Sequence, residues 1–247
     1  NESRNFIEDV NTGYGGGAAD VVFNTVTASP AEIPLPHRGE PVTVAGVPLA
    51  KAKAAMVMVH GRGASAADIL VLAPELDVAG FAFLAPQASG NTWYPNSFLA
   101  PIANNEPGIS GGLAAIGDVL ATIHAAGIPR ERTMLLGFSQ GACLSLEYAA
   151  RNAARYGGIA CLSGGLIGPD NTPRDYSGNF AETPIFLGCS DIDGHIPAIR
   201  VTESAAILKR MGAHTEVKLY PGMGHLVNED EIAHVKNIMK ETLAGAR

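Results

Sequence analysis

The chain has 247 residues, of which 47% are hydrophobic and 17% charged, so it can bury a core of the size expected for one α/β domain. The net charge of −7, with lysine and arginine scattered singly, excludes the basic patch that nucleic acid or an anionic lipid surface requires. The three cysteines, Cys143, Cys161 and Cys189, lie inside apolar runs, which argues against a disulfide framework and for a reducing compartment, the cytoplasm.

The first residues, 1–20, are rich in glycine and asparagine, and we expect them to form a flexible N-terminal arm. They lack the basic and apolar regions of a signal peptide. No apolar run approaches the roughly 20 residues that span a bilayer, so we expect no stable membrane insertion. Residues 21–247 are assigned to a single domain because no repeat or linker divides them. The sequence leaves open whether two copies form a homodimer.

The remaining chain alternates strand and helix patterns. Residues 41–52 resemble an antiparallel hairpin that turns at Ala45 and Gly46 and would form the outer edge of a sheet. Short apolar runs closed by glycine, proline or serine then indicate buried parallel strands at residues 53–61, 81–87, 132–139, 156–165, 183–191 and 215–222. Apolar residues spaced three and four apart predict helices over residues 110–126, 140–154, 197–211 and 228–244, with Gly127 and Gly212 as stops. This order predicts an α/β fold with a mostly parallel central sheet flanked by helices on both faces.

A serine between two glycines marks the junction of the strand at 132–139 and the following helix. Gly137-Phe-Ser139-Gln-Gly141 fits the G-x-S-x-G pattern in the strand–turn–helix context of a nucleophile elbow. In so sharp a turn larger flanking side chains would collide, and the helix N-terminus would favour developing negative charge. The alternative is an N-cap serine in a glycine-rich turn.

A serine hydroxyl becomes a strong nucleophile only when a base takes its proton and an acid orients that base. In this architecture the acid and then the histidine follow the serine along the chain. Asp191 and Asp193 follow one predicted strand and His225 follows the last, so both partners fall at the carboxyl ends of strands. These residues predict a Ser-His-Asp triad.

An oxyanion hole would complete such a site. One donor should be the backbone N–H of the residue after the nucleophile, Gln140, and the other should come from the glycine-rich loop His60-Gly61-Arg62-Gly63. We predict that the N–H of Arg62 is this second donor. His60 is expected to brace the loop by hydrogen bonding rather than to transfer protons.

Four stretches, "HGRGA", "GFSQG", "DGHIP" and "GMGH", make the chain from about residue 36 onward resemble the phospholipase/carboxylesterase family, which includes acyl-protein thioesterases, within the α/β-hydrolase superfamily. The resemblance implies a serine hydrolase without cofactor or metal and a triad of Ser139, Asp193 and His225. It selects Asp193 because Ile196 and Pro197 match the family's D-x-x-V/I-P pattern. Arg62 departs from the apolar residue common in the family, and "NTWYPNSF" matches least well.

The expected reaction is cleavage of small to medium carboxylic esters through an acyl-enzyme on Ser139. An acyl thioesterase or lysophospholipase with the same triad, or a non-catalytic ligand-binding protein, are alternatives. Trp93, Tyr94 and Phe98 are candidate pocket walls, with ordinary core packing as the other interpretation. The insertion at residues 164–182 is too short for a large helical lid, so we expect an open site.

Two other functions can be compared with this one. Gly61-x-Gly63-x-x-Ala66 satisfies a loose dinucleotide fingerprint, but the next strand ends at Gln87 rather than at the carboxylate that a ribose requires. Asp191, Asp193 and His195 suggest a metal site, because carboxylate and imidazole groups both ligate divalent ions. A loop whose acids serve the triad and cap backbone amides explains these residues better. The remaining histidines are expected on the surface or on helix faces: His37, His124, His214 and His234.

Overall fold

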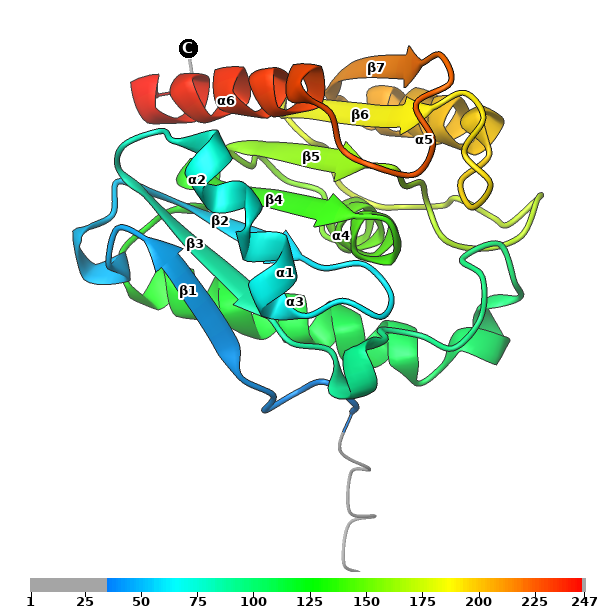
Figure 1. The fold of residues 1–247 in the computed structure, drawn as a ribbon, viewed down its shortest axis with the longest axis horizontal. Helices are drawn as coiled ribbons and strands as arrows, with labels where there is room; N and C mark the ends of the chain where they lie inside the picture. Colours follow the sequence, from blue (N-terminus) through cyan, green and yellow to red (C-terminus); the bar gives the residue numbers. More distant parts are fainter. Residues whose placement is uncertain (1–34, 246–247) are drawn as a thin grey trace, which may run out of the picture. The chain divides into compact units, whose positions relative to one another are not determined.

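The computed structural model describes residues 35–245, so the predicted arm at residues 1–20 and the start of the predicted domain lie outside the described residues. Within this range seven strands form one sheet in the order β1-β3-β2-β4-β5-β6-β7 (Figure 1). Strand β1 is antiparallel to β3, and all other pairs are parallel. The strands are β1 (Val42–Gly46), β2 (Ala54–Val59), β3 (Phe81–Pro86), β4 (Thr133–Phe138), β5 (Gly158–Leu162), β6 (Pro184–Ser190) and β7 (His214–Tyr220).

Helices cover both faces of the sheet, which confirms the predicted fold class (Figure 1). Residues Ala55 and Val57 of β2 face the core formed with α3, α4 and α5, whereas Met56 and Met58 face the core formed with α1, α2 and α6. Strand β2 is buried along its whole length because both of its faces are covered. The helices are α1 (Ala66–Leu70), α2 (Leu72–Leu76), α3 (Gly108–Ala125), α4 (Gln140–Arg151), α5 (Ala198–Arg210) and α6 (Glu229–Ala244).

The four predicted helices correspond to α3–α6, with ends that differ by at most three residues. Gly127 and Gly212 follow α3 and α5 with φ of 87° and 82°, and their N–H groups bond the carbonyls of His124 and Lys209. Both therefore act as the predicted helix stops.

The predicted hairpin at residues 41–52 is wrong, although its place at the sheet edge is correct. Ala45 and Gly46 are not turn residues: they pair with Phe83 and Ala82 of β3. The chain then forms a short 3₁₀ turn at Leu49–Lys51. Alternating valines indicated a strand correctly, but its partner lies far along the chain rather than next to it.

Helices α1 and α2 were not predicted, although the first carries a readable start signal. Ser65 caps the N-terminus of α1, and Asp68 completes the capping box by accepting from the Ser65 N–H. Both helices have only five residues, too short for a clear apolar periodicity.

By length and composition, one helix of the described range, α3, is long and apolar enough to cross a membrane. Ile109, Ile116, Val119 and Ile123 of this helix are buried in the core. A core helix meets the same criterion, so α3 gives little support for membrane insertion.

Candidate active site

Ser139 occupies the sharp turn between β4 and α4, with φ of 54° and ψ of −120°, a region that non-glycine residues rarely adopt. The turn requires glycine on both sides. A Cβ on Gly137 would collide with the backbone of Gly141, and a Cβ on Gly141 would collide with the carbonyl of Val59 in β2. This close packing holds the strained Ser139 at the carboxyl edge of the sheet.

The structure brings Ser139, His225 and Asp193 together from loops that are far apart in the sequence. His225 Nε2 lies 2.8 Å from Ser139 Oγ, and His225 Nδ1 lies 2.7 Å from Asp193 Oδ2. Because the carboxylate accepts the proton of Nδ1, the lone pair of Nε2 faces the serine hydroxyl. Ser139 can therefore lose its proton to His225 as it attacks a carbonyl carbon.

Asp193 is held in its ionised form. Burial acts to raise its pKa, but the hydrogen bond from His225 and those from the N–H groups of His195 and Ile196 outweigh it, so the pKa lies below its usual value. Its side chain is fully buried behind the imidazole. The carboxylate can thus fix the imidazole tautomer and stabilise the imidazolium.

Asp191 has a different position from Asp193. Its Oδ1 accepts the N–H of Gly222 at 2.8 Å, and its own N–H donates to the carbonyl of Tyr220 at 3.1 Å. Neighbouring Ser190 accepts the N–H of Gly224 at 3.1 Å. These bonds tie the loop after β6 to the loop after β7, and the second of these loops carries His225.

The two predicted oxyanion donors, the N–H groups of Arg62 and Gln140, lie on loops that meet beside the serine. Gln140 is the first residue of α4, and Arg62 follows Gly61, where an added Cβ would lie 3.4 Å from that of Ser139. Neither backbone N–H has a hydrogen-bond acceptor among the described residues. Both residues line the cavity around Ser139.

His60 braces the loop that carries Arg62 by hydrogen bonding, as expected from the sequence. Its ring accepts the N–H of Ala88 on Nε2 at 3.1 Å and donates from Nδ1 to the carbonyl of Gly61 at 2.8 Å. Burial lowers the pKa of His60, despite the opposing effect of its bond to Gly61, which favours this neutral form.

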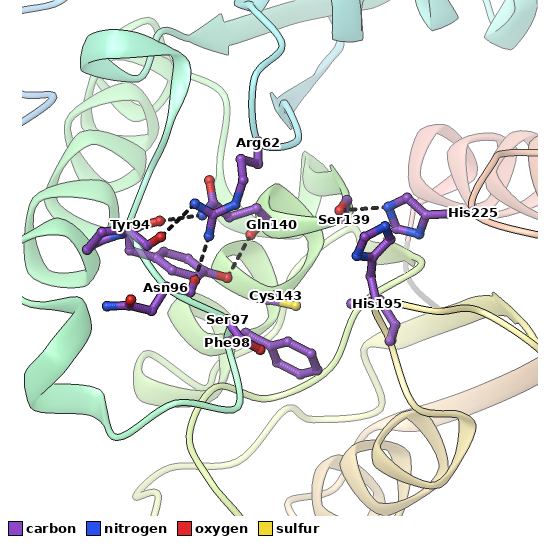
Figure 2. Close-up of a pocket in the computed structure, with 12 residues that line it drawn as sticks. Arg62, Tyr94, Asn96, Ser97, Phe98, Ser139, Gln140, Cys143, His195 and His225 are labelled. Atoms are coloured by element: carbon purple, nitrogen blue, oxygen red, sulfur yellow. Dashed lines mark hydrogen bonds between the residues drawn. The ribbon is translucent and has the colours of Figure 1, made fainter.

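Ser139 opens into a cavity of about 380 Å³ (Figure 2). Tyr94 and Phe98 line it, but Trp93 does not, which corrects our expectation for that residue. The Trp93 indole is fully buried and donates to the carbonyl of His60 at 2.9 Å, so it packs beneath the loop. The lining residues are Arg62, Tyr94, Pro95, Asn96, Ser97, Phe98, Ser139, Gln140, Cys143, His195, Ile196 and His225.

One side of the cavity is formed by Tyr94–Phe98. Together with Trp93, which packs beneath them, these residues form a segment, 93–98, that we call the pocket wall. Gln140 accepts the N–H of Trp93 at 2.8 Å and donates to the carbonyl of Tyr94 at 2.7 Å. The Arg62 guanidinium donates to the carbonyls of Pro95 and Asn96 (Figure 2). The side chains of the two predicted oxyanion residues thus hold the wall.

These roles of the Arg62 and Gln140 side chains were missed because sequence reasoning used only their backbone N–H groups. The cavity-lining positions of His195 and Cys143 were missed as well. His195 had a signal, since it stands two residues after Asp193. Its ring contacts that of His225 edge-on at 4.9 Å between centroids.

His37 contradicts the expectation of a surface or helix-face position. It is buried, accepts the N–H of Ser89 on Nδ1 at 3.0 Å and donates from Nε2 to the carbonyl of Trp93 at 2.9 Å. Burial lowers its pKa, although the bond to Trp93 opposes this effect. The imidazole can be buried here because both of its ring nitrogens form hydrogen bonds, which also join His37 to the segments of Ser89 and Trp93. His124 and His214 are exposed, and His234 lies on α6, as expected.

The structure also bears on the two other interpretations. Gln87, at the end of β3, accepts the N–H of Ala66 and so caps α1, the helix that a dinucleotide pyrophosphate would need. Among residues 35–245 there is no group of three or more histidine, cysteine or acidic side chains arranged to hold a metal ion. Residues 191–195 instead form hydrogen bonds that orient the triad and its loops.

Comparisons with known proteins place the chain in a family. A profile of the phospholipase/carboxylesterase family matches residues 43–243. Acyl-protein thioesterase 1 of Neurospora crassa is 29% identical over 143 residues, covering 56% of this chain and 58% of that protein. Carboxylesterase SOBER1 of Arabidopsis thaliana is 29% identical over 138 residues, covering 54% and 60%. The chain spans about three-fifths of the length of these two curated relatives.

A crystal structure of a phospholipase/carboxylesterase from Dyadobacter fermentans is similar over nearly its whole length. It is 46% identical, covers 81% of this chain and 96% of that one, and has a TM-score of 0.79. The family profile covers most of the present chain and includes the segments that carry Ser139, Asp193 and His225. The chain therefore belongs to the phospholipase/carboxylesterase family.

Proposed function

We propose that this protein is a serine hydrolase that cleaves carboxylic esters of small to medium acyl groups, with Ser139 as nucleophile. The observation that carries the proposal is the unbroken hydrogen-bonded series from Ser139 to His225 to Asp193, at 2.8 and 2.7 Å, in a cavity that Arg62 and Gln140 also line. A structural N-cap serine would have no need for a histidine and a buried carboxylate in line with it.

In the proposed mechanism, Ser139 attacks the acyl carbonyl carbon while His225 takes its proton. The N–H groups of Arg62 and Gln140 stabilise the negative oxygen, and Asp193 stabilises the imidazolium. His225 then gives the proton to the leaving alcohol. Water repeats the attack on the acyl-enzyme, releases the acid and restores Ser139.

The cavity supports a preference for small to medium acyl groups. Its volume of about 380 Å³ lies near the lower end of ligand pockets. Residues 164–182 form no helix, so this insertion supplies no large helical lid to enclose a long chain. The relatives named acyl-protein thioesterase make thioester cleavage a second candidate reaction for the same residues.

Labelling with a fluorophosphonate probe tests the nucleophile directly. Wild-type protein should label stoichiometrically, and Ser139→Ala should not label, whereas Ser145→Ala, which removes a buried serine of α4, should label as wild type. A wild-type protein that folds but does not label would favour the non-catalytic ligand-binding alternative. Matched nitrophenyl esters and thioesters of increasing chain length would then define the preferred bond and acyl group.

We also propose a reducing compartment, the cytoplasm, as the site of action. All three cysteines are free and buried, and burial raises the pKa of Cys143 to about 12, which keeps this thiol protonated. Sedimentation velocity would decide whether the chain is a monomer or a homodimer.

A further inference from the structure

The lining of the active-site cavity carries positive but no negative side chains. Arg62 is a permanent cation, and His195 and His225 are imidazoles, while none of the lining residues is aspartate or glutamate. Asp193 is fully buried behind His225. The whole chain has a net charge of −7, so the cavity differs in sign from the chain as a whole. Such a cavity attracts a negatively charged substrate.

The guanidinium of Arg62 is held in place without being neutralised. It donates to the carbonyls of Pro95 at 2.8 Å and Asn96 at 2.5 Å, and its Cζ lies 6.0 Å from the centre of the Tyr94 ring. A guanidinium has five N–H donors, so these two bonds leave three without a partner among the described residues. Arg151 and Arg200, by contrast, pair with the carboxylates of Glu147 and Asp170.

The position of Arg62 indicates which part of the substrate carries the charge. Its backbone N–H is a proposed oxyanion donor, so its guanidinium lies within one side chain of the carbonyl under attack. His225, which must protonate the leaving alcohol, lies on the opposite side of Ser139 (Figure 2). The group beside Arg62 is therefore the acyl chain and not the alcohol.

We propose that the enzyme acts on monoesters of short dicarboxylic acids and that the Arg62 guanidinium binds the free carboxylate of the acyl group. This inference rests on the proposed function, because it assigns a substrate class to the same site. Arginine suits the role, since its planar fork can bind a carboxylate through two parallel hydrogen bonds. The carbonyls of Pro95 and Asn96 fix the fork before the substrate arrives.

A matched pair of substrates tests the inference. Mono-4-nitrophenyl glutarate and 4-nitrophenyl valerate have acyl chains of equal length and the same leaving group, but only the first carries a carboxylate. Wild-type enzyme should have a kcat/KM for the glutarate about ten- to hundredfold higher, mainly through a lower KM, as expected for a charge-assisted hydrogen bond. Added salt should reduce this ratio.

Variants of Arg62 test whether the preference for glutarate comes from its charge or from its support of the pocket wall. Arg62→Met should remove the preference for glutarate, and Arg62→Lys should keep part of it. Arg210→Met is the matched control, because it removes an exposed arginine that does not line the cavity. Arg210 lies at the C-terminal end of α5, and it is the other end of this helix that begins near Ile196 and the cavity. It should leave the ratio unchanged.

Several outcomes would overturn the inference. Equal use of both esters by wild type, or an equal loss for both in Arg62→Met, would mean that the side chain only supports the pocket wall. A preference for 4-acetoxybenzoate, which carries the carboxylate on the alcohol, over 4-nitrophenyl valerate and the glutarate would contradict the acyl assignment. Failure of fluorophosphonate labelling would instead reject the proposed function, so the two failures are distinguishable.

Discussion

Two regions border Ser139, and they are held in different ways. The loops after β6 and β7, residues 191–197 and 221–228, are ordered by acidic and hydroxyl side chains that accept backbone N–H groups within these loops. The pocket wall at residues 93–98 is ordered by side chains from other elements, Arg62, Gln140 and Asn105. The triad loops are therefore held by bonds within and between the ends of two neighbouring strands. The substrate surface is held by side chains that other elements supply.

The largest expected effect concerns Ser139 and His225, the nucleophile and the base of the proposed triad. Ser139→Ala and His225→Ala should each lower kcat by about 10⁶-fold, because without either residue no activated nucleophile forms. The double variant should be scarcely worse than either single variant. Steady-state hydrolysis of a nitrophenyl ester measures all three, and additive losses would show that the two residues act independently.

The two aspartates of the loop after β6 provide the next test. Asp193→Asn should lower kcat by about 10⁴-fold with folding intact, since the imidazole loses its tautomer and its counter-charge. Asp191→Asn should cost far less, because Asp191 contributes one loop hydrogen bond worth about 1 kcal/mol. If Asp191→Asn were the crippling change, the assignment of the acid would have to be reversed.

The pocket wall should respond differently, through binding rather than chemistry. Gln140→Leu leaves the buried Trp93 N–H and Tyr94 carbonyl without partners, at a cost of about 1–3 kcal/mol each in the free energy of unfolding. KM should rise more than kcat falls. Gln140→Glu, which still accepts from Trp93, should lie between wild type and Gln140→Leu in urea unfolding and in KM. A loss of kcat without a rise in KM would show that the pocket wall takes part in the chemical step.

The smallest expected effect is a pH dependence of stability that arises beneath the wall. Burial lowers the pKa values of His37 and His60 from 6.5, so the folded state binds their protons more weakly than the unfolded state does. Their contribution is complete above pH 6.5 and is lost as the pH falls through the lowered values. These two histidines should therefore lower the free energy of unfolding between about pH 8 and about pH 5, against an opposite change from Glu231, whose pKa burial raises to about 7.

This decrease should be smaller in His37→Gln than in wild type, because only His60 would then titrate in the buried loop. His124→Gln should behave as wild type, since His124 is exposed on α3. Urea unfolding at several pH values measures the effect. A decrease of equal size in all three proteins would assign the acid sensitivity to other groups.

Much of the fold could be predicted because it depends on patterns that each segment carries alone. Apolar runs predicted the strands β2–β7, and spacing predicted α3–α6 to within three residues. The predicted hairpin at residues 41–52 was wrong because an alternating apolar pattern indicates a strand but not the strand with which it pairs. Val42–Gly46 pairs with β3. Helices α1 and α2 were not predicted because five residues are too few to show a helical periodicity of apolar residues.

The sequence by itself determined which residues meet at Ser139. In a parallel sheet the carboxyl ends of strands share one edge, so the order of strands along the chain was enough to bring the loop of Asp191 and Asp193 and the loop of His225 to the serine loop. The resemblance to the family's D-x-x-V/I-P pattern then selected Asp193 over Asp191. Only the tertiary structure decided how Arg62 and Gln140 use their side chains, why Trp93 lies beneath the pocket, and that His37 is buried. Those contacts join segments tens of residues apart, and their geometry depends on how the loops pack rather than on any local pattern.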